Sequence, residues 1–160
     1  MNKLIGVVLA GLMVLAQQGV QAQVSDHATL LNVHAIGVES AAVKASRDFW
    51  QRVGDQKDEQ WYKAPAGYEA AYTDGPVKAL YWYDKNGRWV YSLLTYGEDQ
   101  LPEDVRTLVR STYYDFSIGW VKEVNEAQTT VYVAHIENKK EWKDVAVQEG
   151  EMRVLNEFCK

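Results

Sequence analysis

The strongest constraint on the fold is a series of short strand-like segments separated by turn signals and interrupted by two amphipathic helical stretches. Residues 40–53 place apolar side chains at helical spacing, and Ser40 is the expected N-cap. Residues 101–116, LPEDVRTLVRSTYYDF, repeat this plan, with Pro102 near the first helical position and two acidic residues in the first turn. The two stretches predict two helices of similar design.

Each helical stretch precedes four strand-like segments. In the first half these are EQWYKA, YEAAYT, VKALYWYD and RWVYSLL, and in the second half IGWVKEV, TTVYVAHIE, EWKDVAV and EMRVLNEF. Trp61 and Gly87 in the first half correspond to Trp120 and Gly150 in the second. The pattern predicts an α+β fold of two tandem units, 39–97 and 98–160, each one helix followed by a four-stranded antiparallel meander.

The first 22 residues are typical of a cleaved secretory signal. They carry one charge at Lys3, an apolar run over residues 4–16 and a small-residue cleavage site at 20–22. The apolar run is shorter than the roughly 20 residues of a membrane span. We therefore expect a periplasmic or extracellular mature protein without a membrane span, preceded by an N-terminal arm over 23–38. This arm forms either a lead-in strand or a partly ordered segment.

Charge and cysteine content exclude several classes of partner and bond. The formal charge is −5, and removal of Lys3 with the signal makes it −6. Such an acidic chain lacks the basic footprint of a nucleic-acid-binding protein. The single cysteine, Cys159, excludes an internal disulfide and either pairs between chains or remains a tail thiol.

Residues 82–91, WYDKNGRWVY, predict a hairpin in which a type I turn over 84–87 is closed by a glycine in the left-handed region. Alternation along the strands then places four aromatic side chains on one face, against Phe49 and Trp50 of the first helix: Tyr81, Tyr83, Trp89 and Tyr91. The uncovered face carries Leu80, Trp82 and Val90. Such a patch either packs against the other half of the chain or binds a partner. For the second alternative we predict Leu80, Trp82 and Val90 as the ligand-binding residues.

Known catalytic and metal-binding motifs are not found in the sequence. His27, His34 and His135 lack the spacing of HExxH, and one cysteine cannot form a CxxC site. No GxSxG elbow, Ser-x-x-Lys motif or phosphate-binding glycine loop occurs. We expect no catalytic residue, no metal and no cofactor, and therefore no enzyme.

Several segments together resemble the PepSY-like, β-lactamase-inhibitor-like family of secreted bacterial proteins. They are the signal, the stretch AAVKASRDFW, EQWYK, YEAAY, the hairpin YWYDKNGRW and the second opening QLPEDVRTLV, followed by IGW and WKDVAV. The resemblance implies helix-plus-sheet units whose strands can form one curved sheet with a concave face. It also implies binding or inhibition in place of catalysis, and it supplies no catalytic residue to carry over.

These observations predict a non-enzymatic binding protein that holds a protein, a peptide or a small ligand of the cell envelope on an aromatic sheet face. An inhibitor-like role is one form of this function. The alternative is a structural or self-associating envelope protein whose patch forms a homodimer.

Overall fold

The computed structural model of the protein describes residues 29–31, 40–54, 56 and 58–160. The predicted signal and most of the predicted arm lie outside this range. The described chain forms the following elements in order: β1 (Thr29–Leu31), α2 (Ala41–Val53), β2 (Gln60–Ala64), β3 (Gly67–Asp74), β4 (Val77–Asp84), β5 (Trp89–Tyr96), the short 3₁₀ helix η2 (Glu98–Gln100), α3 (Glu103–Thr112), β6 (Ser117–Glu126), β7 (Thr129–Glu137), β8 (Glu141–Gln148) and β9 (Glu151–Cys159).

All nine strands belong to one antiparallel sheet in which each strand pairs with its neighbours in the sequence. The prediction of two tandem units, each with its own four-stranded meander, is wrong. Hydrogen bonds join β5 to β6 from Ser92–Asn125 to Tyr96–Val121, so the sheet continues across the expected boundary. An unpaired edge at β5 would leave a row of backbone donors and acceptors without partners, and pairing with β6 satisfies them. At the other end, β1 extends the sheet by pairing with β2.

Helix α2 begins and ends where its capping residues require. Ser40 Oγ accepts a hydrogen bond from the backbone N–H of Val43 at 3.3 Å, which confirms the predicted N-cap. The helix ends at Val53 because Gly54 follows it with a φ of 79°, a conformation that favours glycine. Its buried side chains, Ala42, Ala45, Ser46 and Phe49, face the sheet.

Helix α3 is shorter than predicted. Pro102 precedes it, and Glu103 and Asp104 occupy its first turn, as expected. The helix ends at Thr112 because Tyr113 leaves helical geometry with a φ of −119° and a ψ of 61°. Phe116 is the last residue of the stretch predicted as helical, but it joins the α3 core from the loop before β6.

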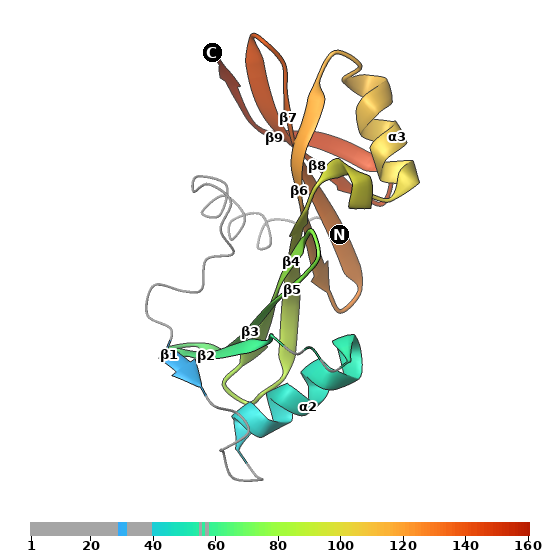
Figure 1. Ribbon diagram of the computed structural model, residues 1–160. Helices are drawn as coiled ribbons and strands as arrows, with labels where there is room; N and C mark the ends of the chain where they lie inside the picture. Colours follow the sequence, from blue (N-terminus) through green and yellow to red (C-terminus); the bar gives the residue numbers. More distant parts are fainter. Residues whose placement is uncertain (1–28, 32–39, 55, 57) are drawn as a thin grey trace.

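Both helices cover the same face of the sheet (Figure 1). Tyr81 packs with the α2 core and pairs across the sheet with Ser92, so the two residues point to one face. Alternation along β5 places Leu94 and Tyr96 on that face too, and both pack in the α3 core. We call the opposite side of the sheet the helix-free face.

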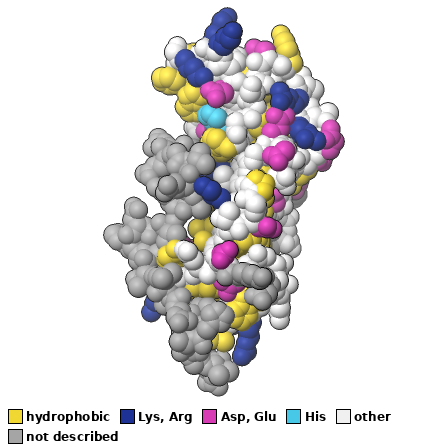
Figure 2. Space-filling model, in the orientation of Figure 1, with side chains coloured by type: hydrophobic (Ala, Val, Ile, Leu, Met, Phe, Trp, Pro, Cys, Tyr) yellow, Lys and Arg dark blue, Asp and Glu magenta, His cyan; other side chains and the backbone are white. Residues whose placement is uncertain are grey.

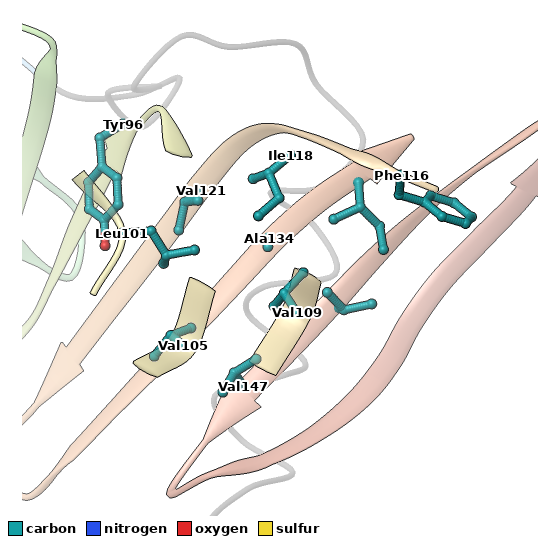
Figure 3. Packing of buried hydrophobic residues seen from close by; sticks show 11 residues of the cluster. Tyr96, Leu101, Val105, Val109, Phe116, Ile118, Val121, Ala134 and Val147 are labelled. Atoms are coloured by element: carbon teal, nitrogen blue, oxygen red, sulfur yellow. The ribbon is translucent and has the colours of Figure 1, made fainter. Parts of the chain in front are cut away.

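The cores under the two helices differ in composition. The α2 core is aromatic: Phe49 contacts Trp61, Tyr72 and Tyr81 edge to face, with centroid distances of 5.3–5.8 Å. The α3 core is mainly aliphatic, and Figure 3 shows its helix side chains beside those of the sheet. Its labelled members include Val105, Val109, Val121, Ala134 and Val147.

The predicted hairpin turn is confirmed, but its register is correct only next to the turn. Gly87 has a φ of 71°, and the Asp84 carboxylate accepts hydrogen bonds from the backbone N–H groups of Asn86 and Arg88. Those bonds to the charged form lower the pKa of Asp84. Tyr83 and Trp89 pair and share one face, as predicted, but a bulge at Val90 then pairs Trp82 with Tyr91. Tyr91 therefore lies on the helix-free face, which corrects its predicted place beside α2.

Candidate functional site on the helix-free face

Four rings form a continuous stack on the helix-free face of the second half, one from each of β6 to β9. We call Trp120, His135, Trp142 and Phe158 the aromatic stack. The Trp120 and His135 rings are parallel within 5°, with centroids 5.0 Å apart. His135 and Trp142 follow at 5.4 Å, and Trp142 and Phe158 at 6.2 Å. The first three rings are half-buried, and Phe158 is 59% exposed.

Alternation along β7 determines the side on which the stack lies. Ala134 and Ile136 are buried in the α3 core, so His135 between them points to the opposite face. His135 pairs across the sheet with Trp120 on β6 and with Asp144 on β8. The stack therefore lies on the face that neither helix covers.

A bulge at Gly119 brings Trp120 into the stack. Ile118 pairs with Ile136 and packs under α3, and Trp120 pairs with His135, so Gly119 is an extra residue in β6. In a regular strand Trp120 would share the face of Ile118, two positions before it. Trp61, its counterpart in the first half, is buried in the α2 core. The two tryptophans of the proposed repeat thus lie on opposite faces.

Hydrogen bonds hold the histidine of the stack in place. His135 Nδ1 lies 2.7 Å from Asp144 Oδ1, and the Asp144 side chain is only 2% exposed. The second oxygen, Asp144 Oδ2, accepts a hydrogen bond from Asn156 Nδ2 on β9 at 3.2 Å. Both oxygens of this buried carboxylate are therefore hydrogen-bonded, as a buried charge requires.

Lys122 lies beside the stack on β6. Its Nζ is 5.0 Å from the centroid of the Trp120 ring, within the range of a cation–π contact. Burial lowers the pKa of Lys122, and the Asp144 carboxylate opposes this shift. The stack therefore has a basic side chain at its β6 end.

The residues predicted from the sequence lie at the other end of the sheet. Trp82 is half-buried on the helix-free face, since Tyr81 and Tyr83 on either side of it pack under α2. Leu80 shares that face but is only 6% exposed, and it pairs with Leu93. Val90 is the bulge residue and is 42% exposed. These three residues are not part of the aromatic stack, and their predicted binding role stays a prediction.

The aromatic stack was not predicted. Trp120, His135 and Trp142 stand far apart in the sequence, and no local pattern connects them. A usable signal was present, because His135 alternates with the apolar Ala134 and Ile136 in TTVYVAHIE. Figure 2 shows a histidine side chain with hydrophobic side chains above and below it and an acidic group nearby.

Within the described residues, no group of three or more His, Cys, Asp or Glu side chains could hold a metal ion. His27 and His34, which were not predicted from the sequence to bind metal, lie outside the described residues, and Cys159 is an exposed free thiol at the end of β9. None of the described helices is both long and apolar enough to cross a membrane.

An open hollow of about 670 Å³ lies where β6, the β7–β8 turn and the end of β9 meet. Two pairs of its polar side chains contact each other: Lys160 Nζ lies 2.6 Å from Glu137 Oε2, and Asn138 Nδ2 donates to Asp115 Oδ2 at 3.1 Å. The lining residues are Asp115, Ser117, Glu137, Asn138, Lys139, Lys140 and Lys160. All are half-buried or exposed, so the hollow lacks a buried polar group that would select a ligand.

Comparisons with known proteins identify the fold. No protein-family model and no curated protein matches the chain. A BLIP-like (β-lactamase-inhibitor-like) protein of Bacteroides fragilis is 18% identical, with a TM-score of 0.58 over 79% of this chain and 89% of that protein. A DUF2874 family protein of Bacteroides ovatus is 16% identical, with a TM-score of 0.57 over 72% of this chain and 85% of that one.

A third structure, from Bacteroides eggerthii, is 14% identical, with a TM-score of 0.55 over 72% of this chain and 86% of that one. Its description proposes that it is periplasmic. At these identities the likeness concerns the fold alone, and the chain has a BLIP-like fold. These similarities do not test the PepSY part of the predicted resemblance, which stays a prediction.

Proposed function

We propose that the protein is a non-enzymatic binding protein of the periplasm or the extracellular space, and that it holds a protein or peptide segment on its helix-free face. The observation that carries this proposal is the aromatic stack on that face. Large aromatic side chains are the commonest energetic anchors of protein interfaces. Monomers rarely leave contiguous apolar patches in water without a function.

The geometry of the stack favours a peptide or protein over a flat ligand. Parallel rings with centroids 5.0 Å apart cannot lie side by side in one plane, so Trp120 and His135 face each other. Solvent therefore meets ring edges and the exposed Phe158 in place of one broad ring surface. Side chains of a partner can pack between and beside such edges.

The proposed location has two supports. The N-terminal sequence is typical of a secretory signal, and a protein of similar fold is described as a candidate periplasmic protein. An inhibitor-like role is one form of the proposed function, supported by the BLIP-like fold. The chemistry of the helix-free face supports binding as such, whatever the effect on the partner.

The test is capture of a partner from envelope and culture-medium fractions, followed by affinity measurement with purified components. We expect Trp142→Ala to weaken binding at least about tenfold, because it removes the central tryptophan of the stack. Tyr114→Ala is the matched control, since Tyr114 is 86% exposed in the loop after α3 and lies outside the stack. A partner that binds both variants equally well would exclude the stack as the binding surface.

Trp82→Ala extends the same test to the residues predicted from the sequence. If the partner reaches the β4–β5 end of the helix-free face, this change weakens binding by more than about 1 kcal/mol. An unchanged affinity would restrict the interface to β6–β9.

Self-association is the second candidate function, and the open edge of β9 favours it. This strand pairs only with β8 in the described sheet, and Val154 and Phe158 on it are exposed. Other features of β9 act against this candidate, because the charged side chains of Arg153 and Glu157 and the bulge opposite Val145 protect a sheet edge from pairing. Sedimentation of the protein as a monomer at high concentration would rule this candidate out.

A further inference from the structure

We propose that His135 Nε2 is the hydrogen-bond acceptor with which the helix-free face selects its partner, and that Asp144 is the positioning residue that keeps it an acceptor. The inference rests on the proposed function of this face and adds the chemistry of the partner. The segment that docks on the stack presents an N–H or O–H donor to His135, flanked by apolar groups for Trp120 and Trp142.

The tautomer follows from the hydrogen bonds of Asp144. An ionised carboxylate only accepts hydrogen bonds, and Asp144 Oδ1 lies 2.7 Å from His135 Nδ1. Asn156 Nδ2 donates to the other oxygen, Oδ2, and so holds the carboxylate in this orientation. The neutral imidazole therefore carries its proton on Nδ1, which leaves a lone pair on Nε2.

Nε2 is available to a partner. It makes no hydrogen bond to any described residue, and it is not among the described buried side-chain atoms that lack a hydrogen-bond partner, so it retains contact with solvent. The His135 side chain is 20% exposed. Rings flank it on both sides, at 5.0 Å for Trp120 and 5.4 Å for Trp142. A partner that covers these rings without supplying a donor leaves Nε2 buried and unsatisfied, which costs binding energy and creates specificity.

The charges around His135 allow the proposal to be tested by pH. Lys122 faces it from β6, Glu137 lies two positions along β7 and Asp144 faces it from β8, and β9 contributes the neutral Asn156. When a histidine is protonated, both ring nitrogens become donors and the acceptor is lost. Binding through Nε2 is therefore expected to weaken at a pH low enough to protonate the imidazole.

Asp144→Asn is the decisive variant, because it has nearly the same shape and reverses the hydrogen bonding. The new amide oxygen can accept from Asn156, and the new amide nitrogen then donates to His135 Nδ1. The proton moves to Nε2, which becomes a donor. His135→Gln is the matched control, since its amide oxygen remains an acceptor while its side chain does not titrate.

The probe is a set of peptides selected at neutral pH from a random phage-displayed library against the secreted protein and then synthesised. We expect the selected peptides to lose at least about tenfold in affinity with Trp142→Ala and with Asp144→Asn. With His135→Gln, we expect the affinity that remains to show no weakening between neutral pH and about pH 5.5, because the amide is not protonated there. Nitrogen-15 NMR of His135 reports the tautomer directly, as Nδ1–H in the parent and Nε2–H in Asp144→Asn.

The outcomes separate this inference from the proposed function. Peptides that bind Trp142→Ala as well as the parent overturn the role of the face, and with it the inference. Another outcome is that peptides bind the Trp142→Ala variant more weakly than the parent but bind Asp144→Asn as tightly as the parent. That result overturns the inference alone. An Nε2–H tautomer in the parent protein also overturns it, whatever the peptides do.

Discussion

The two halves of the sheet place their corresponding tryptophans, Trp61 and Trp120, on opposite faces. Under α2 the rings of Phe49, Trp61 and Tyr83 are buried and form the core. In the second half valines and isoleucines fill the space under α3, and Trp120 and Trp142 lie half-buried on the helix-free face. The comparison teaches that aromatic content by itself does not locate a binding surface. The face on which a ring lies decides whether it stabilises the fold or is available to a partner.

Bulges control this difference. One at Val90 moves Tyr91 away from the α2 core, and one at Gly119 moves Trp120 away from the α3 core. Each is a single extra residue, yet each reverses the face of the residue that follows it. The hairpin WYDKNGRWVY consequently supplies rings to both faces: Tyr83 and Trp89 to the core, and Trp82 and Tyr91 to the helix-free face.

The largest expected effect is that of Phe49→Ala. Phe49 is fully buried and contacts three other rings, so its removal should lower the free energy of unfolding by about 3–5 kcal/mol. Urea denaturation measures the change. A loss below about 1 kcal/mol would show that the aromatic residues under α2 do not form a close-packed core.

The next largest effects are expected from alanine at Gly87 and Gly150, which occupy corresponding positions in the two halves, and the two stability losses should differ. Gly87 and Gly150 have φ values of 71° and 77°, so alanine is strained at both. At Gly87 the new Cβ would also lie 2.2 Å from the Ala41 carbonyl oxygen of α2, whereas nothing lies within 4 Å at Gly150. We expect a loss of about 2–3 kcal/mol for Gly87→Ala and about 1 kcal/mol for Gly150→Ala. Equal losses would mean that the first hairpin does not pack tightly against α2.

Trp142→Ala should cost far less stability than Phe49→Ala, although the side chain removed is larger. Because Trp142 is half-buried on the helix-free face, we expect a loss of about 1 kcal/mol in the free energy of unfolding, again measured in urea. The binding assays should show the opposite ranking for this residue. A loss as large as that of Phe49→Ala would place Trp142 in the core and contradict the comparison.

Deletion of Gly119 should be tolerated. Ile118 and Trp120 would become neighbours in a regular strand and would keep their faces and their partners Ile136 and His135. We expect a stability change within about 1 kcal/mol and an unchanged partner affinity. Replacement of Trp120 by alanine in the same background is the control, since it should weaken binding. Loss of binding after the deletion alone would show that the bulge itself shapes the surface.

The smallest effect is expected at alkaline pH, in the α2 core. Burial, and secondarily Tyr72, raises the pKa of Tyr81 to about 12 from its usual value near 10. The unfolded chain then releases this proton first, so stability is complete below about pH 10 and falls as pH rises towards 12. Tyrosinate absorbance and urea denaturation across this range should show the change, and Tyr81→Phe should reduce the slope. An unchanged slope would assign the alkaline loss to other groups.

Several local features could be predicted from particular residues. Ser40 and Gly54 bound α2, and the turn over 84–87 requires a glycine at 87. The strand-like segments coincide with β2–β9. The joining of both halves in one sheet could not be predicted, because the pairing of β5 with β6 depends on how the chain returns after α3. The aromatic stack could not be predicted either, because its four rings come from four strands.

The sequence by itself determined the elements, because helical spacing, capping residues and turn glycines act over a few neighbouring positions. It also supplied rings in both halves. Only the tertiary structure decided which rings are buried and which are exposed. That decision depends on register, and register depends on hydrogen bonds between strands that are distant in the chain. Spacing along a strand therefore does not by itself give the face of a side chain, because a bulge such as that at Gly119 places Trp120 and Ile118, two positions apart, on opposite faces.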